Sequence, residues 1–204
     1  MHMTGFQKFL KRIIDFFGAL AALIALVMPF FVIAVLIKLD SKGPVFFIQE
    51  RVGKGGKVFR MLKFRTMVEN AVNMGRRIEV EHNDFRITRV GRILRRFGID
   101  ELPQVIHILK GEMSFVGPRP ALPHQAAQYS TSERKRLLVK PGIANMAMLK
   151  GWNALSWKER IQWDTWYIEH WSLFLDLKIL FCTAIIVLLG KGQYGAKGVV
   201  EDYK

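Results

Sequence analysis

The sequence predicts an α/β protein that is mostly helical. Its expected parts are a re-entrant N-terminal membrane segment (helix, break, helix), a small β-hairpin, and interfacial amphipathic helices. Three observations predict this class. Residues 16–37 carry no charge, two apolar runs flank a glycine cluster, and several short segments place apolar residues on one helical face. The predicted organisation is a membrane segment over residues 1–40, a main domain over residues 41–190, and a flexible tail over residues 191–204.

The composition combines a high apolar content with a strong positive charge. Hydrophobic residues make up 50% of the chain, and 31 Lys and Arg stand against 17 Asp and Glu, giving a formal net charge of +14. This combination favours a protein that lies on anionic lipid and handles an anionic substrate. The cations are not gathered in one run, and no groove-reading motif is present, so nucleic acid is not an expected partner. The single Cys182 excludes an internal disulfide and fits a reducing compartment.

The apolar segment of residues 16–37 is long enough to cross a bilayer, but two features argue against a straight span. Pro29 lies beyond its middle, where proline breaks or kinks a helix. Cations flank both ends, and both flanks can lie in the cytoplasm only if the segment enters and leaves by the same face. A kinked transmembrane helix is the alternative, and composition alone does not separate the two.

Two apolar runs around Gly53–Gly56 predict a β-hairpin whose glycines supply positive φ angles. Lys63 and Arg65 alternate with apolar residues, so both cations are expected on one face of the second strand. That face is either a phosphate-binding wall or a solvated edge that prevents aggregation.

Five helices are expected after the hairpin, from periodicity, capping and stop signals. They cover residues 68–80, 88–97, 105–110 and 133–139, and a region opened by the capping box Ser156–Glu159. Residues 179–189 are apolar but too short to span a bilayer, which indicates an interfacial or buried helix. An aromatic stripe at helical spacing is core in most proteins, with headgroup contact as the alternative. The stripe consists of Trp163, Trp166, Tyr167 and Trp171.

Adjacent carboxylates, Asp100 and Glu101, stand among arginines at the predicted start of a short helix. On spacing alone, the favoured interpretation is an N-cap followed by a solvated first-turn Glu. The other interpretation is a site that holds a hard cation and a phosphate together. Arg119 lies between two prolines, so a stiff backbone presents it either as a phosphate contact or as an incidental loop charge.

A series of short motifs runs along nearly the whole chain. In order they are Lys11-Arg12-x-x-Asp15, Gly43-Pro44-Val45-Phe46-Phe47 with Gln49-x-Arg51-x-Gly53, Lys63-Phe64-Arg65-Thr66-Met67, Asp100-Glu101-Leu102-Pro103-Gln104, Lys110-Gly111-x-Met113-Ser114, Gly117-Pro118-Arg119-Pro120 and Pro141-Gly142-Ile143. Each motif is weak by itself. Together, their order and spacing resemble the bacterial sugar transferases of the monotopic phosphoglycosyl transferase family.

The resemblance implies that a sugar-1-phosphate passes from a nucleotide diphosphate sugar, expected to be UDP-linked, to polyprenol phosphate. The products are polyprenol-diphosphate-sugar and a nucleoside monophosphate. By the resemblance, Asp100 attacks the β-phosphate and forms a covalent phosphosugar intermediate, while Glu101 assists the acceptor step or positions the metal. Mg²⁺ is the implied cofactor, with Asp100 as its ligand. The implied phosphate contacts are Arg95, Arg119, Lys63 and Arg65.

The same resemblance implies a monotopic protein of the bacterial inner membrane, with its active site at the cytoplasmic face and anionic lipids as neighbours. It would start the assembly of a surface glycan. A homodimer is also an expectation, but neither the oligomeric state nor the sugar follows from the sequence. Residues 144–153 depart from the family pattern, since Ala, Met and Trp replace polar residues there, so donor choice or activity could differ. The alternative from another class is a non-catalytic basic scaffold or lipid-binding module on a membrane surface.

Overall fold

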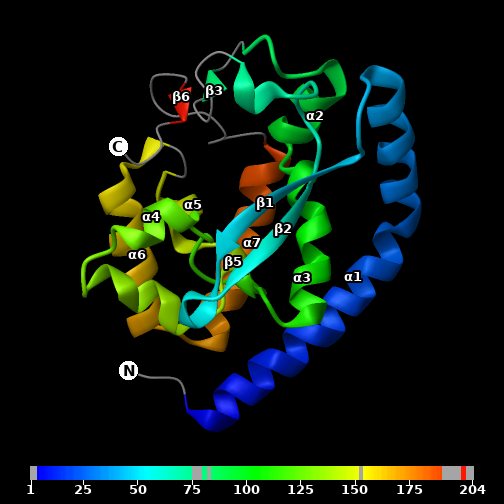
Figure 1. Cartoon of the computed structure of the whole chain (residues 1–204). Helices are drawn as coiled ribbons and strands as arrows, with labels where there is room; N and C mark the ends of the chain where they lie inside the picture. Colours follow the sequence, from blue (N-terminus) through cyan, green and yellow to red (C-terminus); the bar gives the residue numbers. More distant parts are fainter. Residues whose placement is uncertain (1–3, 75–79, 82–83, 152–153, 190–198, 201–204) are drawn as a thin grey trace.

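The computed structural model of the chain describes residues 4–74, 80–81, 84–151, 154–189 and 199–200. Figure 1 shows the long helix α1 (Gly5–Asp40) along one side of the molecule, with α3 (Val105–Lys110) beside it. The other helices are α2 (Arg89–Arg96), α4 (Pro123–Ala127), α5 (Met146–Lys150), α6 (Trp157–Glu169) and α7 (Leu173–Leu188). The strands pair only in small two-stranded sheets within the described ranges. The prediction of a mostly helical α/β chain is confirmed.

α1 is helical throughout, so the predicted break at Pro29 is wrong. Pro29 removes one backbone hydrogen bond and crowds the preceding turn, which bends a helix without ending it when the flanking turns stay paired. Figure 1 shows the axis of α1 changing direction partway along its length. The helix is long and apolar enough to cross a membrane, and its re-entrant path stays a prediction.

One narrow face of α1 packs on the protein, with Asp15, Ala19 and Ile37 buried. Most of its large apolar side chains are exposed, and the most exposed are Phe6, Phe9, Phe17, Ile24, Val27, Met28, Phe31, Val32 and Leu39. A continuous apolar surface of this extent is unusual on a soluble monomer and is typical of a surface that contacts lipid or another protein.

The predicted hairpin is confirmed. Strand β1 (Phe46–Val52) pairs antiparallel with β2 (Val58–Phe64), and positive φ angles at Gly55 and Gly56 make the connection. Strand β2 lies against α3, where the Nε2 atom of His107 accepts a hydrogen bond from the backbone N–H of Leu62 at 3.0 Å. The core between hairpin, α1 and α3 is apolar and consists of Ala19, Phe59, Met61, Val105, Ile108 and Met113.

A second core forms where α5, α6 and α7 meet the parallel strands β4 (Ser114–Val116) and β5 (Gly142–Ala144). Tyr167 is buried in it, and the three tryptophans of the aromatic stripe pack against it. The core interpretation of that stripe is therefore correct. Ala144 and Met146 belong to this core, and Ala147 and Met148 are also buried, so these unusual apolar residues are packing residues.

Local signals located several helices correctly. Thr88 caps α2 by accepting from the N–H of Gly91, and Ser156 forms the predicted capping box with Glu159 at the start of α6. The predicted basic helix over residues 133–139 is a 3₁₀ helix (Glu133–Leu138).

Two other expectations fared differently. The helix predicted over residues 68–80 is wrong in its described part, which contains the 3₁₀ turn Ala71–Asn73 and the first residue of a strand, Val80, while residues 75–79 lie outside the described residues. In the predicted tail, β6 (Val199–Val200) pairs antiparallel with β3 (Val80–Glu81), and the rest of the tail lies outside the described residues.

Candidate active site

The two adjacent carboxylates lie on a 3₁₀ helix, Ile99–Gln104, that leads directly into α3. Gly98 precedes it with a φ angle of 61°, a left-handed conformation that suits glycine and turns the chain sharply after α2. Neither Asp100 nor Glu101 caps a helix, because the N-caps are Gly98 and Gln104 and neither makes a side-chain cap. The N-cap interpretation of Asp100 is therefore wrong, while Glu101 does lie in the first turn.

Glu101 is held between two cations. Its Oε1 atom accepts hydrogen bonds from Lys63 Nζ at 2.7 Å and from Arg119 Nη2 at 2.8 Å, and its Oε2 atom accepts one from Arg119 Nη1 at 3.3 Å. Burial raises the pKa of Glu101, but the charges of Arg119 and Lys63 outweigh burial and hold that pKa well below the ordinary glutamate value. Glu101 is therefore an ionised group that fixes the positions of both cations.

Asp100 has the opposite environment. Its side chain is half-buried, and it forms no hydrogen bond or ion pair with any residue that the structure describes. Burial raises the pKa of Asp100 to about 6, the negative charge of Glu101 adds to that rise, and nearby cations offset part of it. These cations are Lys63, Arg95 and Arg119. Asp100 is thus a poorly solvated carboxylate whose oxygen atoms are free to take a new partner.

Arg95 lies in the last turn of α2, partly buried and close enough to Asp100 for its charge to lower the pKa of that carboxyl group. Within the described ranges its guanidinium donates no hydrogen bond. Arg95 can therefore bind an anion without first giving up a partner.

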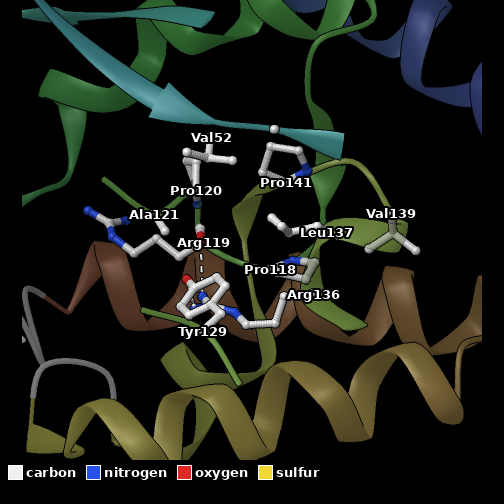
Figure 2. A pocket seen from close by; sticks show the side chains of 11 residues that line it. Val52, Pro118, Arg119, Pro120, Ala121, Tyr129, Arg136, Leu137, Val139 and Pro141 are labelled. Atoms are coloured by element: carbon white, nitrogen blue, oxygen red, sulfur yellow. Dashed lines mark hydrogen bonds between the residues drawn. The ribbon is translucent and has the colours of Figure 1, made fainter. Parts of the chain in front are cut away.

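Arg119 is presented by a backbone whose carbonyl oxygens are all held. The N–H of Gly142 donates to Pro118 at 2.9 Å, Arg136 Nη2 donates to Arg119 at 3.0 Å, and Arg51 Nη1 donates to Pro120 at 3.0 Å. Figure 2 shows the side chain of Arg119 extending away from Arg136, which lies on the other side of this backbone. The gap behind the loop is about 10 Å³, room for about one water molecule. The loop is therefore closely supported from behind.

Sequence reasoning missed the support beneath this loop. Arg136 is buried and forms an ion pair with the buried Asp164 of α6, with 2.6 Å between Nη2 and Oδ2. Its guanidinium also lies over the rings of Tyr129 and Trp157, at 5.4 Å and 5.3 Å from their centres. The only sequence signal was a carboxylate between the tryptophans at 163 and 166, and nothing in the sequence paired it with Arg136.

Arg65 does not join the site, which corrects the expectation that it shares a face with Lys63. Strand β2 ends at Phe64, and the buried side chain of Arg65 turns to the end of α1. There it donates to the carbonyl oxygens of Ile37 at 3.5 Å and Ser41 at 2.8 Å, and also to that of Lys42. These contacts satisfy carbonyl groups at a helix end and leave Arg65 a structural residue.

The donor set at the site fits a metal ion that arrives with its substrate. Among the described residues, no cluster of three His, Cys, Asp or Glu side chains could hold a metal ion. Mg²⁺, however, is commonly bound by one or two carboxylates together with substrate phosphates and water. Asp100 has unengaged oxygen atoms for this purpose, whereas Glu101 is already occupied by Lys63 and Arg119. The expected ligand role of Asp100 is compatible with this arrangement.

Comparison with known proteins finds similarity to bacterial sugar transferases. Residues 6–190 match the family described as bacterial sugar transferase. The chain is 42% identical over 184 residues to a protein of Bacillus subtilis described as an uncharacterized sugar transferase, EpsL, covering 90% of this chain and 89% of the relative.

Two relatives carry a named reaction. The chain is 38% identical to the UDP-glucose:undecaprenyl-phosphate glucose-1-phosphate transferase of Klebsiella pneumoniae, covering 94% of this chain and 43% of the relative. It is 40% identical to the UDP-N-acetylgalactosamine-undecaprenyl-phosphate N-acetylgalactosaminephosphotransferase of Aeromonas hydrophila, covering 90% of this chain and 45% of the relative. The chain thus spans less than half of these two proteins and nearly all of the Bacillus protein.

Taken together, the site gathers positive charge around two adjacent carboxylates that have different surroundings. Three cations from separate elements converge on it, and one carboxylate holds two of them in place. The second carboxylate stays unengaged beside them.

Proposed function

The chain belongs to the bacterial sugar transferase family, and from this premise we propose that it transfers a sugar-1-phosphate from a UDP-linked sugar to polyprenol phosphate. The products are polyprenol-diphosphate-sugar and UMP, and the reaction starts the assembly of a surface glycan. The named reactions of the Klebsiella and Aeromonas relatives support this substrate class.

The observation that carries the proposal is the division of roles between Asp100 and Glu101. Glu101 is ionised and engaged with Lys63 and Arg119, whereas Asp100 makes no such contact among the described residues. A carboxylate nucleophile needs one oxygen that is free to attack, and the groups that stabilise charge on the phosphate are most effective when they are held in advance. The two neighbouring carboxylates meet these two requirements separately.

The proposed reaction has two displacements at phosphorus. In the first, an oxygen of Asp100 forms a bond to the β-phosphorus, and the bond to the bridging oxygen breaks, so that UMP leaves with the electron pair. In the second, a phosphate oxygen of the polyprenol phosphate attacks the same phosphorus, and the bond to Asp100 breaks, which restores the carboxylate. No proton is gained or lost overall. Splitting the transfer avoids bringing two polyanionic substrates to one site at the same moment.

The surrounding residues act on charge and position. Arg119 and Arg95 would contact the non-bridging phosphoryl oxygens, and Lys63 would add a third positive charge. Glu101 is a positioning residue in this scheme, because it fixes Arg119 and Lys63. A bound Mg²⁺, with Asp100 as its protein ligand, would supply charge neutralisation on the diphosphate.

Placement at a membrane supports the same proposal. α1 has the length and composition to enter a bilayer, and its exposed apolar surface faces away from the folded domain. We propose a monotopic arrangement at the cytoplasmic face of the bacterial inner membrane, where the phosphate of the lipid-linked acceptor lies at the level of the site.

The test follows the phosphosugar itself. The full-length protein in detergent is given Mg²⁺ and UDP-sugars labelled in the sugar, first without and then with polyprenol phosphate. Without acceptor, mass spectrometry of the digested protein should find one sugar-phosphate on the peptide that contains Asp100. With acceptor, the label should move to lipid.

The variant Asp100→Asn should lose both the adduct and the turnover, whereas the matched control Glu50→Gln, which removes an exposed carboxylate on β1, should keep both. An adduct on another side chain, or wild-type turnover by Asp100→Asn, contradicts the proposal.

A further inference from the structure

A second cavity lies at the far end of α3 from Asp100. Its volume is about 420 Å³, within the range of small-molecule sites. It is bordered by the N-terminal part of α1, the connection between α6 and α7, and residues 138–140. Asp100 precedes the start of α3, whereas Arg12, on the wall of this cavity, donates to the carbonyl oxygens of Ile108 and Leu109 near the end of α3. The cavity is therefore separate from the candidate active site.

The cavity gathers positive charge that the described residues do not balance. Five cations line it, namely Lys8, Lys11, Arg12, Lys54 and Lys140. Lys11 forms an ion pair with Asp176, and Asp15 is the one lining carboxylate. The Oδ1 atom of Asp15 already accepts hydrogen bonds from Ser114 Oγ at 3.1 Å and from the backbone N–H of Phe115 at 3.2 Å. Within the described ranges, Lys8, Lys54 and Lys140 form no ion pair.

The side-chain nitrogens of Arg12 and Lys140 both lie beside Gly111. A Cβ atom placed on Gly111 would lie 3.4 Å from Arg12 Nη2 and 3.5 Å from Lys140 Nζ. Burial lowers the pKa of Lys140, and the nearby charges of Arg12, Lys54 and Lys11 lower it further, with only Asp15 acting in the other direction. A partly buried ammonium among like charges is unfavourable, and a bound anion removes that cost.

The same cavity has an apolar wall, and residues of α1 line one side of it. Leu138 and Trp171 line it together with the cations. On α1, Lys8, Lys11 and Arg12 share one helical face at spacings of three and four residues, while the strongly exposed Phe6 and Phe9 lie on other faces. Cations beside a lipid-facing apolar surface are characteristic of headgroup depth in a bilayer.

We propose that this cavity binds the phosphate headgroup of an anionic membrane phospholipid. Lys140 and Lys54 contact the phosphate, Arg12 and Lys8 add positive charge, and the apolar wall takes the first carbons of the acyl chains. The lipid is held by electrostatic and apolar contacts, and no covalent bond forms. The inference does not depend on the transferase reaction, since the cavity and Asp100 lie at opposite ends of α3.

The experiment compares two variants that lose the same charge. Lys54→Gln/Lys140→Gln removes two lining lysines, and Lys57→Gln/Lys158→Gln removes two exposed lysines outside the cavity. The full-length proteins are titrated in neutral detergent with dioctanoyl phosphatidylglycerol, with dioctanoyl phosphatidylcholine and with inorganic phosphate. Affinities come from calorimetry and from lipid adducts in native mass spectrometry. Circular dichroism checks that each variant is folded.

Wild-type protein and the control variant should bind phosphatidylglycerol with equal affinity, and the cavity variant should bind at least about tenfold more weakly. Lys140→Arg, which keeps the charge, should retain binding and covers the case in which the double variant misfolds. Equal weakening in both double variants would mean general surface attraction and overturn the proposal. Equal binding of phosphatidylcholine would reduce the site to an apolar cavity, and equal binding of inorganic phosphate would reduce it to a free-phosphate site, and either result also overturns it.

Discussion

The guanidinium of Arg119 contacts both carboxylate oxygens of Glu101, with 2.8 Å from Nη2 to Oε1 and 3.3 Å from Nη1 to Oε2. A two-point contact of this kind fixes the plane of the guanidinium as well as its distance. Because Lys63 contacts the same Oε1 atom, Glu101 links the hairpin to the Pro118–Pro120 loop. Arg119 and Lys63 are therefore both occupied by Glu101, and the oxygen atoms of the neighbouring Asp100 accept no hydrogen bond from either cation.

The pH dependence of the first displacement, which releases UMP, should report the protonation state of Asp100. Burial raises the pKa of Asp100 to about 6, and the protonated carboxyl group is not a nucleophile. The rate of UMP release should therefore fall as pH drops through about 6, approaching a tenfold loss for each further pH unit. Single-turnover measurements from mildly acidic to mildly alkaline pH check this, with circular dichroism to show that the fold persists. A rate that is level across that range would contradict the assignment.

Replacing Glu101 by Gln should move that profile. The negative charge of Glu101 is one of the causes that raise the pKa of Asp100, so its removal shifts the acid limb of the rate profile to lower pH. The maximal rate should also fall, by about 10²-fold or more, because Arg119 and Lys63 lose the group that holds them. A merely structural effect would lower the rate without moving the limb. The same single-turnover measurement distinguishes the two outcomes.

Asp100→Asn should give a more stable protein at neutral pH. The pKa of Asp100 lies higher in the folded protein than the ordinary value of 3.8, so the folded state holds its proton more tightly. The protonated Asp100 therefore adds to the free energy of unfolding at low pH, and this contribution is lost as pH rises toward about 6. Removing the charge removes this cost, and the melting temperature at pH 7.5 should rise by about 2–4 °C. The control Glu50→Gln should leave it unchanged, and no difference between the two variants would refute the expectation.

Removing either partner of the buried Arg136–Asp164 ion pair, which lies beneath the Pro118–Pro120 loop, should destabilise the protein. Arg136→Met leaves Asp164 buried without its cation, and Asp164→Asn leaves Arg136 without its anion. Each should lower the free energy of unfolding by about 3–5 kcal/mol, and the double variant by less than the sum of the two. Denaturant titration of the detergent-solubilised protein measures the cycle. Additive losses would show that the pair is not coupled.

Labelling in intact cells should settle the path of α1. In a Cys182→Ser background, which removes the only native cysteine, single cysteines replace Gly5 and Lys42 on either side of the apolar segment. For a re-entrant helix at the cytoplasmic face, both should be shielded from a membrane-impermeant thiol reagent until the cells are opened. Labelling of one position alone in intact cells would show a straight crossing.

Sequence reasoning located what local signals determine. The capping residues Thr88 and Ser156 and the hairpin glycines act within a few residues, and the elements that they define are present. The association of Asp100, Glu101, Lys63 and Arg119 in one site also followed from the family motifs. What local signals could not give was the destination of Arg65, since only the fold reveals that the end of α1 lies beside it.

The wrong helix over residues 68–80 has a tertiary cause. Buried Arg86 donates to the carbonyl oxygens of Ala71 at 3.2 Å and Met74 at 2.9 Å, so these oxygens serve a distant side chain. Asn70 also takes a positive φ of 60°, which ends any helical run before Ala71. A long-range arginine contact thus overrides local helix propensity, in the same way that the unpredicted Arg136–Asp164 pair supports the loop from a distance.

Two arginines hold α1 against the rest of the molecule at its opposite ends. Arg12, near the start of α1, grips the last turn of α3, and Arg65, just after the hairpin, grips the last turn of α1. The 3₁₀ helix that carries Asp100 leads directly into α3, and Arg12 joins α3 to α1. In the membrane arrangement proposed above, bilayer thickness and the tilt of α1 would therefore set the height at which Asp100 meets a lipid-borne acceptor.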